Sequence, residues 1–106
     1  SNSVKEEILK VNAKTLVEKG AVSSEVALQM ALGVMKKFKS NIGIATTGIS
    51  GPSGGSKEKP VGLIYIAIVS KNRQVVKKFN LIPDREKHRR IATQVCLNML
   101  RLFLKK

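Results

Sequence analysis

The residues best suited to chemistry lie in one glycine-rich segment, residues 46–62, with the sequence TTGISGPSGGSKEKPVG. Five of the chain's eight glycines and two of its three prolines fall between positions 48 and 62. Because glycine has no side chain, such a segment can bring backbone N–H groups close to a bound anion or another ligand. Loops of this length are uncommon in compact domains unless they are functional or disordered. We therefore expect one wall of a ligand site here, with a long structural turn as the alternative.

The segment differs from two common phosphate-binding loops. A P-loop ends in glycine, lysine and serine or threonine and leads into a helix, whereas Lys59 is followed by Pro60 and an apolar run. The dinucleotide-binding fingerprint also places its glycines at the start of a helix, and the pattern here does not. The spacing thus indicates a general cradle for an anion or ligand.

Few residues outside this segment could serve catalysis or metal binding. His88 is the only histidine, Cys96 is the only cysteine, and the seven acidic residues are scattered along the chain. We therefore predict no metal site, no cofactor and no serine–histidine–acid triad. A serine–lysine arrangement with Lys5 as the base is the remaining possibility, with a solvent-facing helix residue as the simpler interpretation of Lys5. We interpret His88 as a surface residue and Cys96 as a small buried side chain.

The elements that must position these residues are predicted from the spacing of apolar positions. Two short helices are expected at residues 4–10 and 12–19, the second ended by Gly20. A firmer helix is expected to follow a cap at Ser23 or Ser24. Its predicted core-facing stripe consists of Val26, Ala27, Met30, Ala31, Val34, Met35 and Phe38.

Three strands and a final helix are expected to follow. Residues 41–47 are mostly apolar and are predicted to form a central strand, and residues 61–70 are apolar on both alternating faces, as in a strand covered on two sides. A short connection leads to a hairpin partner at residues 74–81. Asp84 is predicted to cap a helix that runs to about Leu104, with a core stripe of Ile91, Ala92, Val95, Met99, Leu100 and Phe103. This order of elements predicts the α/β class.

The chain is strongly basic, with 20 Lys and Arg residues against 7 Asp and Glu residues and a formal net charge of +13. Such a balance favours a phosphate-bearing or polyanionic partner. Basic residues occur in every segment, however, and the densest group is only Arg85, Lys87, Arg89 and Arg90. Aromatic residues that could stack on bases make up only 4% of the chain. We therefore expect a solvated lysine-rich surface and a small-molecule nucleotide substrate, with nucleic-acid binding as the disfavoured alternative.

The bulk properties indicate one domain. The chain has 106 residues, of which 42% are hydrophobic, and no apolar run approaches the length of about 18 residues that suggests a membrane span. We expect no membrane association. The single cysteine fits a reducing cytoplasm, which is the predicted location. Three strands leave parts of a sheet bare, so we also expect a homo-oligomer.

Four stretches in register resemble the CinA C-terminal domain family, the nicotinamide-nucleotide amidases. The residues 46–68 segment TTGISGPSGGSKEKPVGLIYIAI is similar to the family's signature, with its threonine-glycine-isoleucine, glycine-proline, glycine pair and lysine-proline-valine-glycine. GAVSSEVALQMALGV resembles the helix after the family's glycine-alanine-valine-serine start, and DREKHRR resembles the opening of its last helix. SNSVKEEIL is similar to the segment that follows its tyrosine-serine-asparagine, so the resemblance covers essentially the whole chain.

The resemblance carries expectations for the fold and the reaction. It implies a three-layer α/β/α fold with a small mixed sheet, here lacking the family's N-terminal helix and strand. It implies that residues 1–106 form one amidase-type domain that is incomplete at its N-terminus. The family hydrolyses the amide of nicotinamide mononucleotide (NMN), which gives nicotinic acid mononucleotide and ammonia.

The resemblance also implies the site residues. Lys5 falls on the family's active-site lysine and is the implied catalytic residue. Arg85 and Arg89 would contact the substrate phosphate, and the alternative role for them is a helix cap or a structural salt bridge. The implied substrate-binding residues are Thr47, Gly48, Ile49, Ser50, Gly51, Gly54, Gly55, Arg85 and Arg89.

The chain departs from the family in its nucleophile. The family's serine lies in a glutamate-serine-any-threonine-glycine-glycine helix start, with an assisting tyrosine, and neither occurs in these 106 residues. Ser50, Ser53 and Ser56 do not match the position of that serine. We therefore expect this chain to be inactive as it stands, either as a fragment of a longer amidase, which we favour, or as a shortened relative. The alternative functions are a basic module that binds nucleic acid and a domain that binds a pyridine nucleotide without turnover.

Overall fold

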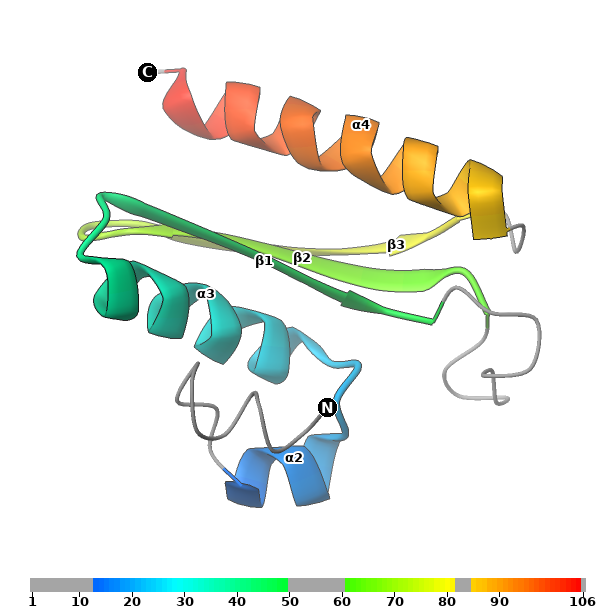
Figure 1. The fold of residues 1–106 in the computed structure, drawn as a ribbon, viewed down its shortest axis with the longest axis horizontal. Coiled ribbons are helices and arrows are strands. Elements are labelled where there is room, and N and C mark those ends of the chain that lie inside the picture. The colour runs from blue at the N-terminus through cyan, green and yellow to red at the C-terminus, as the bar shows by residue number, and fades with distance from the viewer. Residues whose placement is uncertain (1–12, 50–60, 82–84, 106) are drawn as a thin grey trace.

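The computed structural model describes residues 13–49, 61–81 and 85–105. Two helices cover the two faces of a three-stranded sheet, and a third helix lies outside the lower layer (Figure 1). The elements are α2 (Ala13–Lys19), α3 (Ser24–Phe38), β1 (Ile42–Gly48), β2 (Leu63–Ser70), β3 (Gln74–Asn80) and α4 (Arg85–Leu104). The three-layer α/β prediction is therefore confirmed. The helix expected at residues 4–10 lies outside the described residues.

The ends of α3 follow from side-chain and backbone hydrogen bonds. Ser23 is the N-cap, because its Oγ accepts a hydrogen bond from the N–H of Val26 at 3.2 Å. Glu25 stands in the first turn, where a negative charge interacts favourably with the helix dipole. At the other end, Lys39 takes a left-handed conformation with φ 50°, and its N–H and that of Ser40 bond back to carbonyl oxygens of the last turn.

One member of the predicted α3 stripe is not in the core. Phe38 is 69% exposed, although the helical repeat puts it on the same side as Ala27 and Ala31. Phe38 is the last residue of the helix, and the turn at Lys39 leads the chain directly into β1. The ring thus extends past the end of the sheet, because a periodic pattern predicts which side a residue faces but not where the opposite layer stops.

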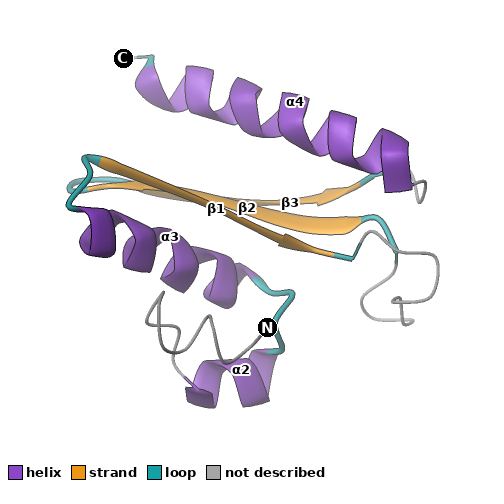
Figure 2. Cartoon of the chain, viewed as in Figure 1, coloured by secondary structure: helices purple, strands orange, loops and turns teal. Residues whose placement is uncertain are grey.

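The described strands are paired in the order β1-β2-β3, and both pairs are antiparallel (Figure 2). Residues Ile42 to Gly48 pair with Ser70 back to Ile64, and β2 pairs with β3 over its length. The expectation of a mixed sheet is therefore wrong for the described strands, since each neighbour follows its partner directly in the chain and can pair antiparallel. The prediction of residues 41–47 as the central strand is also wrong among the described strands, because β2 lies between β1 and β3. The low polarity of β1 reflects its face on α3, where Gly43, Ala45 and Thr47 are buried.

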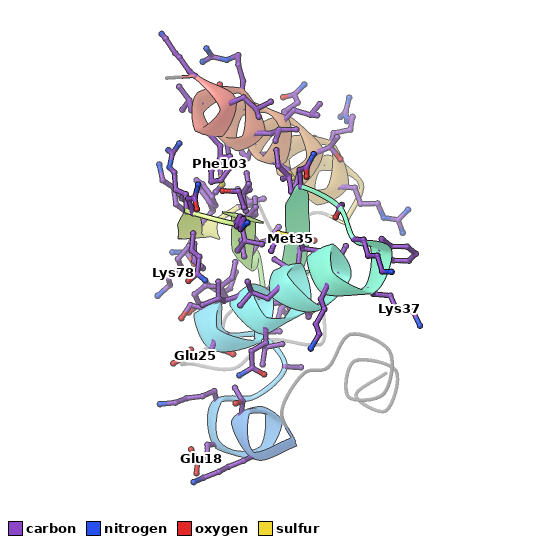
Figure 3. All side chains as sticks on the ribbon, turned by 90° about the vertical axis from the view of Figure 1, so that its left-hand side faces the viewer. Glu18, Glu25, Met35, Lys37, Lys78 and Phe103 are labelled. Atoms are coloured by element: carbon purple, nitrogen blue, oxygen red, sulfur yellow. The ribbon has the colours of Figure 1, made fainter. Side chains whose placement is uncertain are left out.

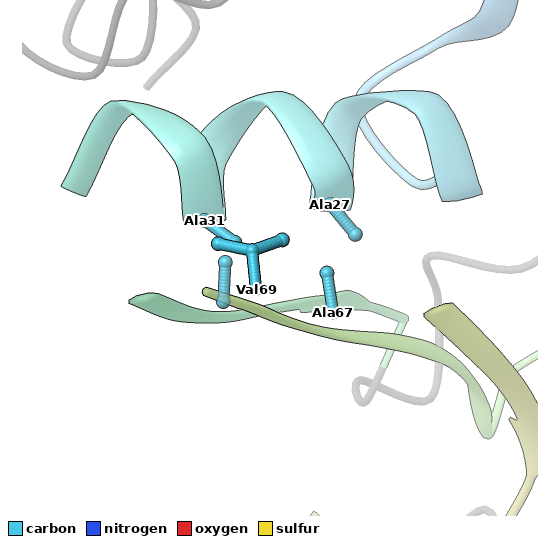
Figure 4. Close-up of a cluster of buried hydrophobic side chains, with 5 residues drawn as sticks. Ala27, Ala31, Ala67 and Val69 are labelled. Atoms are coloured by element: carbon cyan, nitrogen blue, oxygen red, sulfur yellow. The ribbon is translucent and has the colours of Figure 1, made fainter. Parts of the chain in front are cut away.

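The core between α3 and the sheet is built from small side chains (Figure 4). Ala27 and Ala31 of α3 pack against Ala67 and Val69 of β2, with all four side chains fully buried. At Gly43 an added Cβ would overlap the carbonyl oxygen of Ala31. The backbones of α3 and β1 are therefore in direct contact, which only glycine at this position permits.

The core between α4 and the sheet is built from larger side chains. Met99 and Phe103 of α4 pack on Ile64, Ile66 and Ile68 of β2. Residues of β2 are thus buried from both sides, as the apolar run predicts. The predicted α4 stripe is also confirmed, since its members are buried or half-buried while Leu97 and Leu104 are 60% and 58% exposed.

Arg73 holds the end of α4 against the β2–β3 turn. Its Nη1 donates a hydrogen bond to the carbonyl oxygen of Phe103 at 2.8 Å, and its guanidinium carbon lies 4.5 Å from the centre of the Phe103 ring. One side chain therefore caps a helix carbonyl and makes a cation–π contact at the same time. None of the described helices is long and apolar enough to cross a membrane.

The close contact at Gly43 generates a stability prediction. Gly43→Ala should lower the free energy of unfolding by about 2 kcal/mol or more, because the new methyl group must push α3 away from β1. Urea denaturation followed by circular dichroism measures the change. Thr46→Ala, at an exposed position of the same strand, is the control and should change stability by less than about 1 kcal/mol. Equal stability of the wild type and Gly43→Ala would contradict the backbone contact.

Candidate functional site

The two ends of the glycine-rich segment are joined by backbone hydrogen bonds. The N–H of Ile49 donates to the carbonyl of Leu63 at 2.9 Å, and the N–H of Gly62 donates to the carbonyl of Ile49 at 2.6 Å. The N–H of Leu81, at the end of β3, donates to the carbonyl of Gly62 at 2.7 Å. We call Gly48, Ile49, Gly62 and Leu63 the loop neck. The bonds fix where the segment leaves β1 and returns to β2.

Both glycines of the loop neck lie where a side chain would collide with backbone. Gly62 has φ 97°, and an added Cβ would overlap the carbonyl oxygen of Leu81. At Gly48 an added Cβ would lie 2.8 Å from the carbonyl oxygen of Leu63. The sequence pattern predicts that the glycines of this segment are places where backbone can come close to a ligand. At its two ends, Gly48 and Gly62 instead have a structural role, because they allow close contact between backbone segments.

Thr47 connects the end of β1 to the segment that precedes α3. Its Oγ1 donates a hydrogen bond to the carbonyl oxygen of Ala21 at 2.7 Å, and the side chain is only 9% exposed. In the same segment, Ser23, which follows Ala21 by two residues, donates a hydrogen bond from its Oγ to the carbonyl of Gly20 at 3.0 Å. Thr47 thus uses its hydroxyl proton to position residues 20–23, which identifies a positioning role for it.

On the opposite face of the sheet, β1 and α4 enclose a hollow of about 220 Å³. Its lining is mostly apolar and includes two threonines; we call it the β1–α4 hollow, lined by Thr46, Ala92, Thr93, Cys96 and Leu97. Such a volume is below the range for drug-sized ligands and suits a fragment such as one ring. Thr46, the β1 residue of this lining, directly precedes Thr47 in the chain.

Arg89 lies on α4 one turn before residues that line the β1–α4 hollow. The hydroxyl of Thr93 donates to the carbonyl of Arg89 at 2.9 Å, one turn earlier on α4. Residues three and four apart share one side of a helix, so Arg89 precedes the lining residues Ala92 and Thr93 on the same side. Its side chain is exposed. A positive charge is therefore available on α4, one turn before the lining of this apolar hollow.

Cys96 contributes a thiol to the lining of this hollow. The side chain is half-buried, and burial raises the pKa of the Cys96 thiol above its ordinary value, because the thiolate loses hydration. The neutral thiol therefore predominates near pH 7, and its nucleophilicity is low. The prediction of a small buried side chain at Cys96 is correct only in part, since Cys96 is half-buried and lines the hollow.

The structure brings part of the predicted site together. Gly48 and Ile49 belong to the loop neck and Thr47 directly precedes it at the end of β1, while Arg89 stands on α4 one turn before residues that line the β1–α4 hollow. Arg85 is the first residue of α4, one turn before Arg89, and its side chain lies outside the described residues. Also outside them are Lys5, Ser50, Gly51, Gly54 and Gly55, whose roles stay predictions. No group of three His, Cys, Asp or Glu side chains that could hold a metal occurs within residues 13–49, 61–81 and 85–105.

Three contributors to this region were not predicted from the sequence. Thr46 and Thr93 line the β1–α4 hollow, and the carbonyl of Ala21 receives the Thr47 bond. The alternation along β1 contains a signal for Thr46, because it marks a polar residue on a face that is otherwise apolar. No local pattern signals Ala21, which acts through its backbone.

The chain is similar to known proteins along nearly its whole length. The model of the CinA C-terminal domain matches residues 1–104 of this chain. A competence-damage inducible protein of Clostridioides difficile is 52% identical over 106 residues, which are 100% of this chain and 25% of that protein. A CinA-like protein of Geotalea daltonii is 46% identical over 95% of this chain and 24% of its own length. The chain thus spans about a quarter of the length of the curated relatives it matches.

Solved structures agree with the fold. The competence/damage inducible protein CihA from Agrobacterium tumefaciens aligns with a TM-score of 0.95 at 36% identity, over 99% of this chain and 65% of that chain. A competence-damaged protein (CinA) superfamily protein from Enterobacter cloacae aligns with a TM-score of 0.93 at 27% identity, over 99% of this chain and 62% of that one.

The loop neck yields a prediction about Gly62. Gly62→Ala should lower the free energy of unfolding by about 3 kcal/mol, because the substitution combines an unfavourable positive φ with overlap on the Leu81 carbonyl. Thermal unfolding measures the loss. Asn80→Ala, an exposed change one residue before Leu81, is the control and should stay within about 0.5 kcal/mol of the wild type. A small effect of Gly62→Ala would mean that the neck is not held as described.

The thiol of Cys96 yields a prediction about pH. The rate of alkylation by iodoacetamide should rise with pH to a midpoint that is higher in the folded protein than in urea, because only the thiolate reacts and burial disfavours it. At neutral pH the folded protein should therefore react more slowly than the unfolded one. Mass spectrometry of timed samples gives both rates, and coinciding pH profiles would contradict the burial of Cys96.

Proposed function

Because the chain belongs to the CinA C-terminal domain family, we propose that it forms the nucleotide-binding part of a nicotinamide-nucleotide amidase domain. One observation supports this proposal above the others: the loop neck and the β1–α4 hollow share the C-terminal end of β1, and Arg89 lies on α4 one turn before the lining of that hollow. The amidase activity itself rests on the resemblance of the glycine-rich segment and its neighbours to that family's motifs.

The chemistry of the hollow fits the parts of a pyridine mononucleotide. A flat ring would lie in the β1–α4 hollow between apolar walls, with Thr46 in the lining. The phosphate would lie toward the start of α4, where Arg89 offers a charge-assisted hydrogen bond. The first turn of a helix also favours an anion, because its N–H groups are not used within the helix.

Hydrolysis of the amide requires more than these residues. A nucleophilic oxygen must attack the amide carbon, ammonia must leave, and water must release the acid from the acyl intermediate. We assign the proton transfers to Lys5 on the strength of the family resemblance. The family's serine motif does not occur in the 106 residues, so we expect these residues alone to bind NMN without turning it over. We also propose a cytoplasmic location and self-association, which are supported by the single cysteine and the short sheet.

Binding of NMN tests the proposal. Isothermal titration calorimetry should detect NMN binding to the 106-residue chain and weaker binding of nicotinamide riboside, which lacks the phosphate. Arg89→Gln should weaken NMN binding about tenfold or more, which corresponds to the loss of one charge-assisted hydrogen bond. It should leave the affinity for the riboside nearly unchanged.

Arg90→Gln is the matched control, since Arg90 is also exposed on α4 but lines a different hollow, together with Lys87, Ile91 and Gln94. It should change NMN binding less than about twofold, because it removes the same charge away from the β1–α4 hollow. Absence of NMN binding, or equal losses in the two variants, would refute the proposed site.

A further inference from the structure

The acidic residues of this chain are confined to a few positions. Residues 26–57, 59–83 and 87–106 contain no Asp or Glu, while basic residues occur in all three ranges. The seven acidic residues are Glu6, Glu7, Glu18, Glu25, Glu58, Asp84 and Glu86. The C-terminal half of α3, the β2–β3 turn, β3 and nearly all of α4 therefore carry positive charge without a carboxylate in the same stretch of chain, while β1 and β2 carry no charge.

The fold gathers three of these stretches at one end of the molecule. The last turn of α3, the β2–β3 turn and the last turns of α4 meet at the end of the sheet away from the loop neck (Figure 1). The bond from Arg73 to Phe103 joins the second and third of them. We call this surface the basic end; its exposed basic residues are Lys36, Lys37, Lys39, Lys71, Arg73, Arg101 and Lys105. Figure 3 looks onto this end of the molecule.

A hollow of about 460 Å³ opens at the basic end, between α3 and the β2–β3 turn. Lys36 and Lys71 reach it from opposite sides, and the remaining lining is Met35, Ser40, Asn41, Ser70 and Asn72. Ser40 donates its hydroxyl proton to the carbonyl of Ile42 at 3.0 Å, so the two ammonium groups and the two asparagine amides are the chief donors. Ammonium and amide donors around a concave surface suit the oxygens of a phosphodiester.

An exposed aromatic ring is close in the chain to residues that line this hollow. Phe38 is 69% exposed and stands between Lys37 and Lys39 in the chain. It follows Met35, which lines the hollow, by three residues, and residues at that spacing are neighbours on a helix surface. A nucleobase has the flat face on which an exposed aromatic ring can stack, and the neighbouring lysines can pair with the phosphates on either side of that base.

We propose that the basic end binds single-stranded nucleic acid, with backbone phosphates at Lys36 and Lys71 and a base stacked on Phe38. Combined charge and stacking is the usual means of binding a single strand without reading its sequence. A flat anionic membrane would use the lysines but not the concave hollow. The proposed surface lies at the opposite end of β1 from the β1–α4 hollow, so it is independent of the amidase proposal.

Fluorescence anisotropy with a labelled 12-nucleotide oligothymidylate tests the proposal on the whole chain. Affinity should fall steeply as salt rises from about 50 to 200 mM, because bound counterions are released from the phosphates. Lys36→Gln combined with Lys71→Gln should weaken binding about tenfold and reduce the salt slope by about 1.4, that is, about 0.7 for each phosphate that a lysine no longer neutralises. Phe38→Leu should weaken binding about fivefold or more while the salt slope stays unchanged, because the ring carries no charge.

A double variant of equal charge is the control. Lys14→Gln combined with Lys19→Gln removes two charges from α2, where each lysine faces a glutamate, Glu18 at 3.8 Å and Glu25 at 3.9 Å. It should change affinity less than about twofold if the contact is local. All of these positions are exposed, and matching circular dichroism spectra would establish that the variants fold.

Five results would overturn the proposal. The first is binding that does not respond to salt, and the second is an equal loss of affinity in the α2 control. The third is an unchanged affinity in Phe38→Leu, and the fourth is duplex DNA bound as tightly as the single strand. The fifth is tighter binding to vesicles of anionic phospholipid than to the oligonucleotide, which would assign the basic end to a membrane surface.

Discussion

The contact between Gly43 and the carbonyl of Ala31 sets the spacing on which the rest of the molecule depends. Because the backbones of α3 and β1 touch there, the side chains buried beside that contact are small, as at Ala27 and Ala67. The short spacing also brings the segment before α3 against the end of β1, so that Thr47 can reach the carbonyl of Ala21. The start of α3 and the loop neck are thereby held at the same end of the sheet.

The other face of the sheet is packed with larger side chains, and the candidate site results from that difference in spacing. α4 packs through Met99 and Phe103 on the isoleucines of β2, and Arg73 holds its last turn against the β2–β3 turn. With bulky side chains as spacers and its end tied toward β3, α4 leaves space over β1. The β1–α4 hollow is that space, and it is lined from both elements. A ligand site here requires no distortion of either layer, since it uses a place that the packing leaves unfilled.

Features determined by neighbouring residues could be predicted from the sequence, and features determined by distant ones could not. The Ser23 cap, the sheet-facing side of α4 and the double-sided burial of β2 all follow from local spacing, and they are confirmed. The exposure of Phe38 and the edge position of β1 among the described strands depend on where other elements end. Within the candidate site, the glycines of the loop neck were evident as composition, but their φ and close contacts were not. The partners of Thr47 and Arg73 lie 26 and 30 residues away, and no periodicity predicts pairs of that kind.

The burial of β2 on both faces has a consequence during synthesis. Its sequence LIYIAIVS has no charge and no proline or glycine, so before the two helices dock it is the described segment best suited to intermolecular β-pairing. Lys71 and Arg73 follow it at once, and Lys59 and Pro60 precede it by a few residues. Charged and proline residues at such borders act as gatekeepers that slow aggregation of a nascent chain. The positive charges next to β2 are therefore expected to oppose aggregation while the chain folds, in addition to lying on the surface of the folded protein.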